Sequence, residues 1–223
     1  MRKFVFTIAI TFTLLMQPVS VNAENVERIL FSGSELLYPL PKGFCNVTES
    51  IQGIILKDII DKQKNPMVPV AQLIISPCEP NITNPGYPWG WIGVIKNPSR
   101  LRQETLNKMT VKLLTDEDLV EKVLKQLEDK NTEVVKEFYG VDTKIDSNEQ
   151  RVIWADKDSI LLVGNRAGQV DGTAIKEVFV SSTTVIDDLF IYIFIYNLEG
   201  AIPSGKQMSE LLINNASRLK KLN

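Results

Sequence analysis

The stretch Leu-Phe-Ile-Tyr-Ile-Phe-Ile-Tyr, residues 189–196, decides how this chain folds. In an extended strand, side chains alternate between the two faces of a sheet. One face then carries Leu189, Ile191, Ile193 and Ile195, and the other carries Phe190, Tyr192, Phe194 and Tyr196. β-branched and aromatic residues suit a pleated, buried surface, and neither face is charged. The pattern therefore predicts a central strand that is covered on both faces, with a helix on at least one.

A membrane span is the rival interpretation of the same stretch. A spanning helix needs about 20 consecutive apolar residues. Asp187 and Asp188 precede this run and Asn197 and Glu199 follow it closely, so it is too short. A transmembrane barrel strand would alternate apolar with polar side chains, which this stretch does not.

The N-terminus has the pattern of a secretory signal peptide. Arg2 and Lys3 supply the positive start, residues 4–16 form an apolar run, and Val21-Asn22-Ala23 resembles a cleavage site. We expect residues 1–23 to be removed, leaving residues 24–223 as a single domain. Removal of two cations leaves 23 Lys and Arg against 27 Asp and Glu, a formal charge of −4. This mild acidity argues against a nucleic-acid partner, because such proteins usually present a basic face.

Cys45 and Cys78 are the only cysteines of the 223-residue chain. In an oxidising compartment such a pair is first interpreted as a disulfide, with two separate thiols as the alternative. The bridge would close a loop of about 34 residues and stabilise the fold by about 3.5–4 kcal/mol in the chain-entropy model.

The remaining elements follow from apolar spacing and from turn residues. The spacing predicts a hairpin over 26–38 and a helix over 50–64, and then strands over 68–76 and 89–95. A helix is expected from Thr115 onward, while 100–114 is ambiguous between a helix face and a turn. Strands are expected over 151–155, 159–166, 174–184 and 189–198. A last helix follows Ser204, which forms a capping box with Gln207. Short links between the last strands imply an antiparallel meander. The fold class is therefore α+β, a mainly antiparallel sheet covered by about three helices.

This order of elements resembles the Mog1/PsbP-like sandwich, in particular through the final strand pair followed by a terminal helix. Separately, Pro41-Lys42-Gly43-Phe44-Cys45 resembles the Pro-x-Gly-Phe-Cys turn of small exported bacterial proteins that are uncharacterised. The first resemblance covers most of the chain through topology and the second covers five residues. Neither brings catalytic residues with it.

The chain lacks the usual residues of catalysis. It has no His, which removes Ser-His-Asp and Cys-His arrangements and histidine-rich zinc sites, and no cofactor motif is present. Asp142, Asp146, Asn148 and Glu149 crowd one segment, for which a solvated acidic turn is favoured over a calcium site. Asp187 and Asp188 could form a carboxylate pair, although acidic residues before a strand are usually turn formers. We therefore predict no catalytic residues and no metal or cofactor.

A segment rich in proline and glycine is the best candidate for binding. Tyr87, Trp89 and Trp91 lie within residues 85–95, and Trp89 and Trp91 share one side if the stretch is extended. Large amphipathic rings carry much of the energy of interfaces, although the favoured interpretation here is that they cover the open face of the sheet. The favoured function is an exported, non-catalytic module that binds a protein or an envelope component, in the periplasm or outside the cell. The alternative is a carrier of a small apolar ligand, with the aromatic residues of 189–196 lining its cavity.

Overall fold

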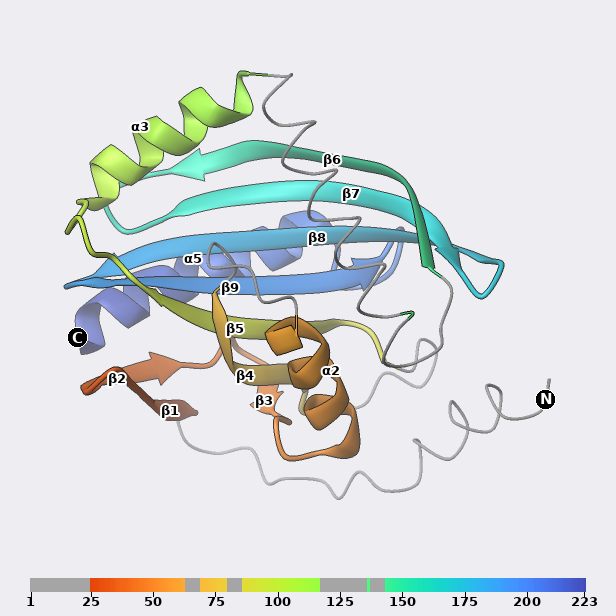
Figure 1. Ribbon diagram of the computed structural model, residues 1–223, viewed down its shortest axis with the longest axis horizontal. Coiled ribbons are helices and arrows are strands. Elements are labelled where there is room, and N and C mark those ends of the chain that lie inside the picture. The colour runs from red at the N-terminus through yellow and green to blue at the C-terminus, as the bar shows by residue number, and fades with distance from the viewer. Residues whose placement is uncertain (1–24, 63–68, 80–85, 117–135, 137–142) are drawn as a thin grey trace.

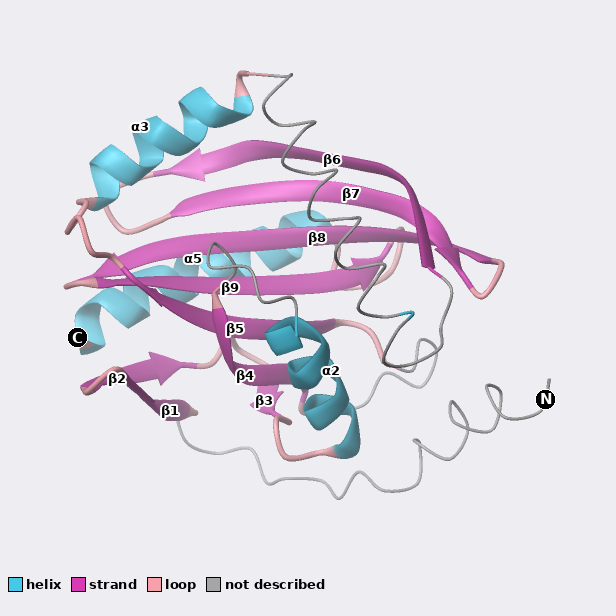
Figure 2. Cartoon of the chain, in the orientation of Figure 1, coloured by secondary structure: helices cyan, strands magenta, loops and turns pink. Residues whose placement is uncertain are grey.

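The computed structural model describes residues 25–62, 69–79, 86–116, 136 and 143–223 (Figures 1 and 2). The strands are β1 (Val26–Phe31), β2 (Ser34–Pro39), β3 (Phe44–Asn46), β4 (Val70–Pro77), β5 (Trp89–Lys96), β6 (Thr143–Ala155), β7 (Ile160–Val170), β8 (Thr173–Ile186) and β9 (Leu189–Leu198). The helices are α2 (Ile51–Lys62), α3 (Gln103–Leu114) and α5 (Gly205–Leu222). The predicted α+β class is confirmed.

Seven strands form one antiparallel sheet in the order β3-β4-β5-β9-β8-β7-β6. The strand β9, which contains the stretch 189–196, is the middle one of the seven. The last four strands are joined by short turns, so the expected C-terminal meander is confirmed. The hairpin of β1 and β2 is separate, and its turn at Ser32 and Gly33 has positive φ at both residues, as tight hairpins require.

Helix α5 covers one face of the sheet, while α2 lies over the other (Figure 1). The capping box of α5 is present, since the Ser204 side chain accepts from the Gln207 N–H and the Gln207 side chain accepts from the Ser204 N–H. Met208, Leu212 and Leu219 of α5 are buried in the same apolar cluster as the aliphatic residues of β9.

The β1–β2 hairpin is hydrogen-bonded to α5. The Tyr38 hydroxyl donates to Asn215 Oδ1 at 2.9 Å, and the Asn215 amide donates to the Pro39 carbonyl. Because Tyr38 and Asn215 are both buried, each satisfies a polar group that water cannot reach. Residues of the hairpin, including Ile29 and Leu36, complete this larger apolar cluster.

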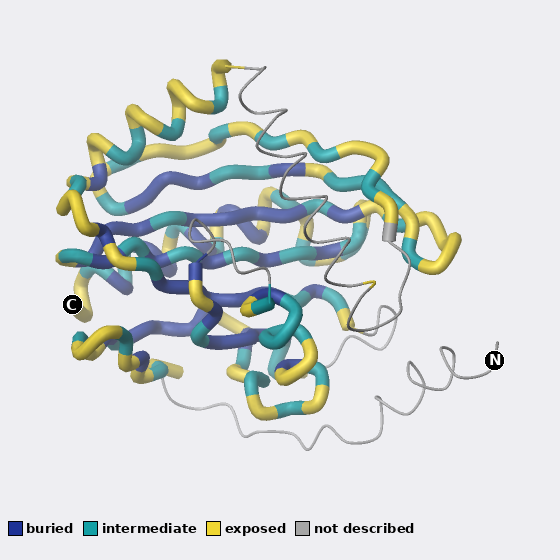
Figure 3. Tube along the Cα trace, in the orientation of Figure 1, coloured by how far each residue is buried: buried dark blue, intermediate teal, exposed yellow. Residues whose placement is uncertain are grey.

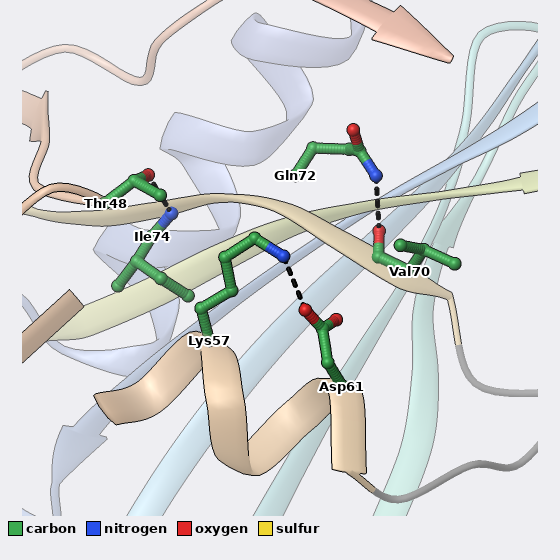
Figure 4. A network of polar contacts seen from close by, with 6 residues as sticks. All are labelled: Thr48, Lys57, Asp61, Val70, Gln72 and Ile74. Carbon is green, nitrogen blue, oxygen red and sulfur yellow. Dashed lines mark hydrogen bonds and ion pairs between the residues drawn. The ribbon is translucent and has the colours of Figure 1, made fainter. Parts of the chain in front are cut away.

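Helix α2 packs on β4 and β5 on the other face of the sheet. Ile60 and Leu56 of the helix contact a second cluster formed with Ile74 and Trp91. The Thr48 hydroxyl, just before the helix, accepts from the Ile74 N–H at 2.9 Å and so ties the α2 entry to β4 (Figure 4). The other contacts in that view, Lys57 with Asp61 along α2 and Gln72 with the Val70 carbonyl along β4, are local.

A disulfide joins Cys45 on β3 to Cys78 just after β4, as predicted. The helix α2 and the strand β4 lie between the two cysteines along the chain. The bridge therefore ties the edge strand β3, rather than the expected turn before α2, to the end of its neighbour β4.

Two predictions about single segments need correction or completion. Residues 103–114, ambiguous in sequence, form helix α3. Strand β6 begins at Thr143 rather than at residue 151, so Asp146, Asn148 and Glu149 lie in a strand and not in the expected acidic turn. As the edge strand it needs no buried apolar face, which is why its polar sequence resembled a loop.

Other predictions fall outside the described residues, namely the signal peptide of residues 1–23, Asp142, and most of the helix expected from Thr115. None of the described helices is long and apolar enough to cross a membrane.

Candidate functional site

The three residues predicted to bind, Tyr87, Trp89 and Trp91, lie at and beside the start of β5, a strand inside the sheet. Trp89 pairs with Tyr196 of β9 and Trp91 pairs with Phe194. Each tryptophan stacks on its partner with ring centroids 4.6 Å apart. The prediction that Trp89 and Trp91 share one side is therefore confirmed, and the side is the aromatic face of β9.

A further ring from β8 extends this row across the sheet. Phe179 is the register partner of Tyr196, and their ring centroids are 5.8 Å apart. On the next strand, Gly164 lies beneath Phe179, and a Cβ at Gly164 would approach the Phe179 ring to 2.3 Å. Only glycine leaves room for the ring there. We call Trp89, Trp91, Phe179, Phe194 and Tyr196 the aromatic ladder.

Buried residues concentrate along the middle strands of the sheet (Figure 3), but burial is uneven along the aromatic ladder. Trp91 is only 6 % exposed and belongs to the cluster beneath α2, so it is a core residue in this structure. Trp89 and Tyr87 are half-buried, which leaves part of each ring accessible. A role in recognition is therefore open to Tyr87 and Trp89 rather than to Trp91.

An ion pair between a half-buried Arg166 and a buried Glu177 lies at the end of the aromatic ladder. Glu177 of β8 is 6 % exposed and is the register partner of Arg166 on β7. Arg166 Nε donates to Glu177 Oε2 at 2.8 Å, and a terminal guanidinium nitrogen donates to the same oxygen. The Tyr87 hydroxyl donates to Glu177 Oε1. The Arg166 guanidinium also lies 5.6 Å from the centroid of the Tyr196 ring, within cation–π range.

The electrostatics of this Arg166–Glu177–Tyr87 cluster favour a fixed arrangement over proton transfer. Burial, the charge of Glu177 and the hydrogen bond to it raise the pKa of the Tyr87 hydroxyl well above its usual value. Burial lowers the pKa of Arg166, but the charge of Glu177, the hydrogen bond to it and the interactions with Tyr196 and Tyr87 together outweigh burial and raise it. Tyr87 therefore remains a donor and Arg166 a cation at neutral pH. The cluster positions Tyr87 against the sheet.

An exposed apolar stripe on α2, missed in the sequence, adjoins this segment. Ile51, Ile54 and Ile55 are 62 %, 57 % and 40 % exposed, although they share one side of the helix at i, i+3 and i+4. An added Cβ at Gly86, next to Tyr87, would lie 3.7 Å from Gln52 Nε2 of α2, so the two segments are neighbours. We call Ile51, Ile54 and Ile55 the isoleucine stripe.

The spacing of isoleucines in 50–64 predicted the helix but could not say which side is buried. Ile60 faces the sheet while the isoleucine stripe faces away, because Gly53 sets the helix against the preceding turn. A Cβ at Gly53 would lie 2.0 Å from the Val47 carbonyl oxygen, so the backbone approaches there as only glycine allows. The available signal was an excess of apolar positions over what one helix face can hold.

The acidic candidates do not converge. Asp187 and Asp188 form the turn between β8 and β9, and Asp187 has a positive φ of 48°. The Asp188 carbonyl accepts from the Asn97 N–H at 2.6 Å. In the part of the chain that the structure describes, no three or more Cys, Asp or Glu side chains gather as metal ligands would.

Comparison with solved structures shows a distant similarity, whereas the other two comparisons found no match. No family model matches the chain, and no curated protein matches it. Among solved structures, the chain is similar to the solution structure of cyanobacterial PsbP (CyanoP) from Synechocystis sp. PCC 6803. The TM-score is 0.34 and the identity is 12 %, over 93 % of this chain and 96 % of that chain. This is consistent with the PsbP-like part of the resemblance seen in sequence, and it carries no argument about function.

Proposed function

We propose that this protein is an exported, non-catalytic interaction module that binds a protein partner through α2 and the segment beside it. The observation that carries the proposal is the isoleucine stripe. A helix that covers a sheet normally needs one apolar side, whereas α2 has a second one turned to solvent. Contiguous apolar residues on a surface commonly mark interaction sites.

Tyr87 and Trp89 support the same surface. Both rings are half-buried, and Tyr87 is held against the sheet through Glu177. Rings that are fixed before binding lose little conformational entropy on contact with a partner. The proposed contact surface therefore comprises the isoleucine stripe and residues 86–89. These four residues are the part of the predicted segment 85–95 that we retain.

Export is supported by two independent features. Residues 1–23 have the charge and apolar pattern of a secretory signal. The disulfide between Cys45 and Cys78 is of the kind that persists in oxidising compartments such as the periplasm or the extracellular space.

The carrier alternative has less support. A carrier needs an apolar cavity, but the four rings expected to line it contact other rings. Phe194 and Tyr196 are stacked, and Phe190 meets Tyr192 edge to face. The structure does have a pocket of about 350 Å³, but charged side chains line much of it and it lies at the α3 end of the sheet. Native mass spectrometry of protein purified from its own host tests this alternative, because a retained apolar molecule would favour the carrier.

The interaction proposal is tested by capture from an envelope fraction with quantitative mass spectrometry. Ile54→Glu places a charge in the isoleucine stripe, and the matched control Met109→Glu changes a side chain of similar exposure, 55 %, on α3. We expect a specific partner to be lost with Ile54→Glu and retained with Met109→Glu, while circular dichroism shows both variants folded. Equal capture by both variants would contradict the proposed surface.

A further inference from the structure

A pocket of about 350 Å³ opens at the end of the sheet where α3 begins and α5 ends. Figure 1 shows that the β8–β9 turn, the start of α3 and the C-terminus of α5 lie at this same end. Six charged residues from separate segments line the pocket: Arg100, Arg102, Glu104, Lys157, Asp187 and Lys220. The pocket is remote in sequence from the isoleucine stripe.

The charge of the pocket is opposite to that of the whole protein. Four cations against two carboxylates leave a formal excess of two positive charges, whereas the complete chain carries −2. Across the described ranges, no ion pair engages any of the four cations. Arg100, Arg102 and Lys157 are exposed, so solvent reaches them. Such a concentration of one sign draws in small ions of the opposite sign.

The backbone that carries these cations is held in place by buried amide side chains. The Asn97 side chain, 1 % exposed, accepts from the Leu101 N–H and donates to the Leu101 carbonyl, both at 2.9 Å. The Asn97 N–H donates to the Asp188 carbonyl at 2.6 Å. This fixes the segment with Arg100 and Arg102 against the turn with Asp187.

Two residues of α3 hold the segments that carry Val185 and Lys157. Gln103, 5 % exposed, accepts from the Val185 N–H at 2.7 Å and donates to Asn107 Oδ1 at 2.9 Å. Asn107 in turn donates to the Asp156 carbonyl at 2.7 Å, beside Lys157. Three chain segments with cations or carboxylates are thus joined before any ligand arrives, which lowers the entropic cost of binding.

We propose that this pocket binds a small phosphate monoester. The excess of two positive charges complements a dianion, and the guanidinium groups of Arg100 and Arg102 match phosphate oxygens in pairs. The volume is near the lower limit of small-molecule sites, which suits a compact ester with one phosphate group. The residues Gln103 and Glu104 that open α3 also line the pocket, so the positive end of the helix dipole adds to the same potential.

The test is calorimetric titration of the purified protein with glycerol phosphate and with inorganic phosphate, in a chloride buffer of low ionic strength. The variant Arg100→Gln with Arg102→Gln removes two cations from the pocket. We expect it to weaken binding by about tenfold or more, because charge-assisted hydrogen bonds to the phosphate are lost. The matched control is Lys42→Gln with Lys206→Gln, which neutralises two exposed cations elsewhere. Lys206 is about 20 Å from Lys220 along α5. This control should bind within about twofold of the parent protein.

A third variant tests the sign of the effect. Asp187→Asn removes a negative charge from the pocket, and asparagine tolerates the positive φ of 48° at this position. We expect stronger binding, by a factor of about three to ten. No saturable binding up to about 10 mM, or equal affinities for all variants, would overturn the proposal.

The source of the phosphate ester is resolved by a second arm of the same experiment. Sedimentation is measured with phosphatidylcholine vesicles with and without phosphatidic acid, whose headgroup is a phosphate monoester. Binding to the phosphatidic acid vesicles that glycerol phosphate displaces would identify a lipid headgroup. Binding of the free ester alone would identify a soluble ligand, and both results support the shared chemistry.

Discussion

The two faces of the central strand β9 differ in how they are sealed. Leu189, Ile191, Ile193 and Ile195 are all buried, and the residues between them are all intermediate. On the aliphatic face, α5 and the β1–β2 hairpin close over the sheet. On the aromatic face, rings stack along the sheet and end at the Arg166–Glu177–Tyr87 cluster.

This difference indicates that the aliphatic face serves stability alone, whereas part of the aromatic face is available for recognition. Aliphatic side chains have no polar atoms, so they can be covered completely by a helix at no cost in unpaired groups. Tyrosine and tryptophan present an apolar ring together with a polar tip, so they suit a face that is partly wet. The aromatic face can therefore serve as core beneath α2 and as surface near Tyr87.

The largest effect that sharpens this comparison is expected for Trp91→Ala. Trp91 is buried with Ile74 and Ala71 beneath α2, so removing it should lower the free energy of unfolding by about 3–5 kcal/mol. Trp89→Ala should cost about half as much, because Trp89 is half-buried. Urea unfolding followed by circular dichroism measures both. Equal losses of unfolding free energy would mean that Trp89 and Trp91 contribute equally to the core, which contradicts the difference in burial described above.

Loss of the disulfide is the next largest effect. Replacing Cys45 and Cys78 by Ala should lower the free energy of unfolding by about 3.5–4 kcal/mol, because the unfolded chain regains the entropy of a closed loop. Since this effect acts on the unfolded chain, both faces should lose stability in one cooperative transition. Thermal melting followed by near-ultraviolet and far-ultraviolet circular dichroism tests this. An unchanged melting temperature would show that the bridge contributes little.

Tyr87→Phe is expected to lower the free energy of unfolding by about 2 kcal/mol at neutral pH, since buried Glu177 loses a donor. Tyr38→Phe on the α5 side should cost about 1 kcal/mol, because its acceptor, Asn215, is neutral.

The two tyrosine variants also carry a pH signature. Burial and the charge of Glu177 raise the pKa of Tyr87 above its usual value of 10.0. The protonated hydroxyl therefore contributes stability that is fully present below pH 10 and is lost as the pH rises further. The difference in free energy of unfolding between the parent protein and Tyr87→Phe, measured by urea titration, should become smaller above pH 10. A constant difference would show that the hydroxyl is not held by the carboxylate.

The smallest effect concerns the turn between β6 and β7. Burial tends to raise the pKa of Asp156, but the backbone N–H groups of Ser159 and Asp158, with Trp154 and the charge of Lys157, together outweigh it and hold the pKa below 3.8. The ionised carboxylate therefore contributes stability above pH 3.8 that is lost as the pH falls below it. Asp156→Asn keeps an acceptor oxygen, so its melting temperature should be slightly lower at pH 7 and converge with the parent at pH 3. A difference that grows in acid would contradict this assignment.

Local patterns were sufficient for much of the fold. Alternation in 189–196, the Ser204–Gln207 capping box and the pair of cysteines each correspond to the observed structure. The period of two also placed Trp89 and Trp91 on one side. Strand β6 was predicted too short, since an edge strand need not alternate, and α3 stayed ambiguous because it buries only Gln103.

The sequence by itself determined the central strand, the fold class and the exclusion of histidine-dependent sites. These depend on composition and on neighbours within a few residues. Only the tertiary structure decided that Trp89 stacks on Tyr196, that Arg166 meets Glu177 and that four cations share one pocket. Each of these depends on strand register or on turns that meet at one end of the sheet. Register is set by the packing of the whole molecule, so residues about 100 positions apart become partners without any local signal.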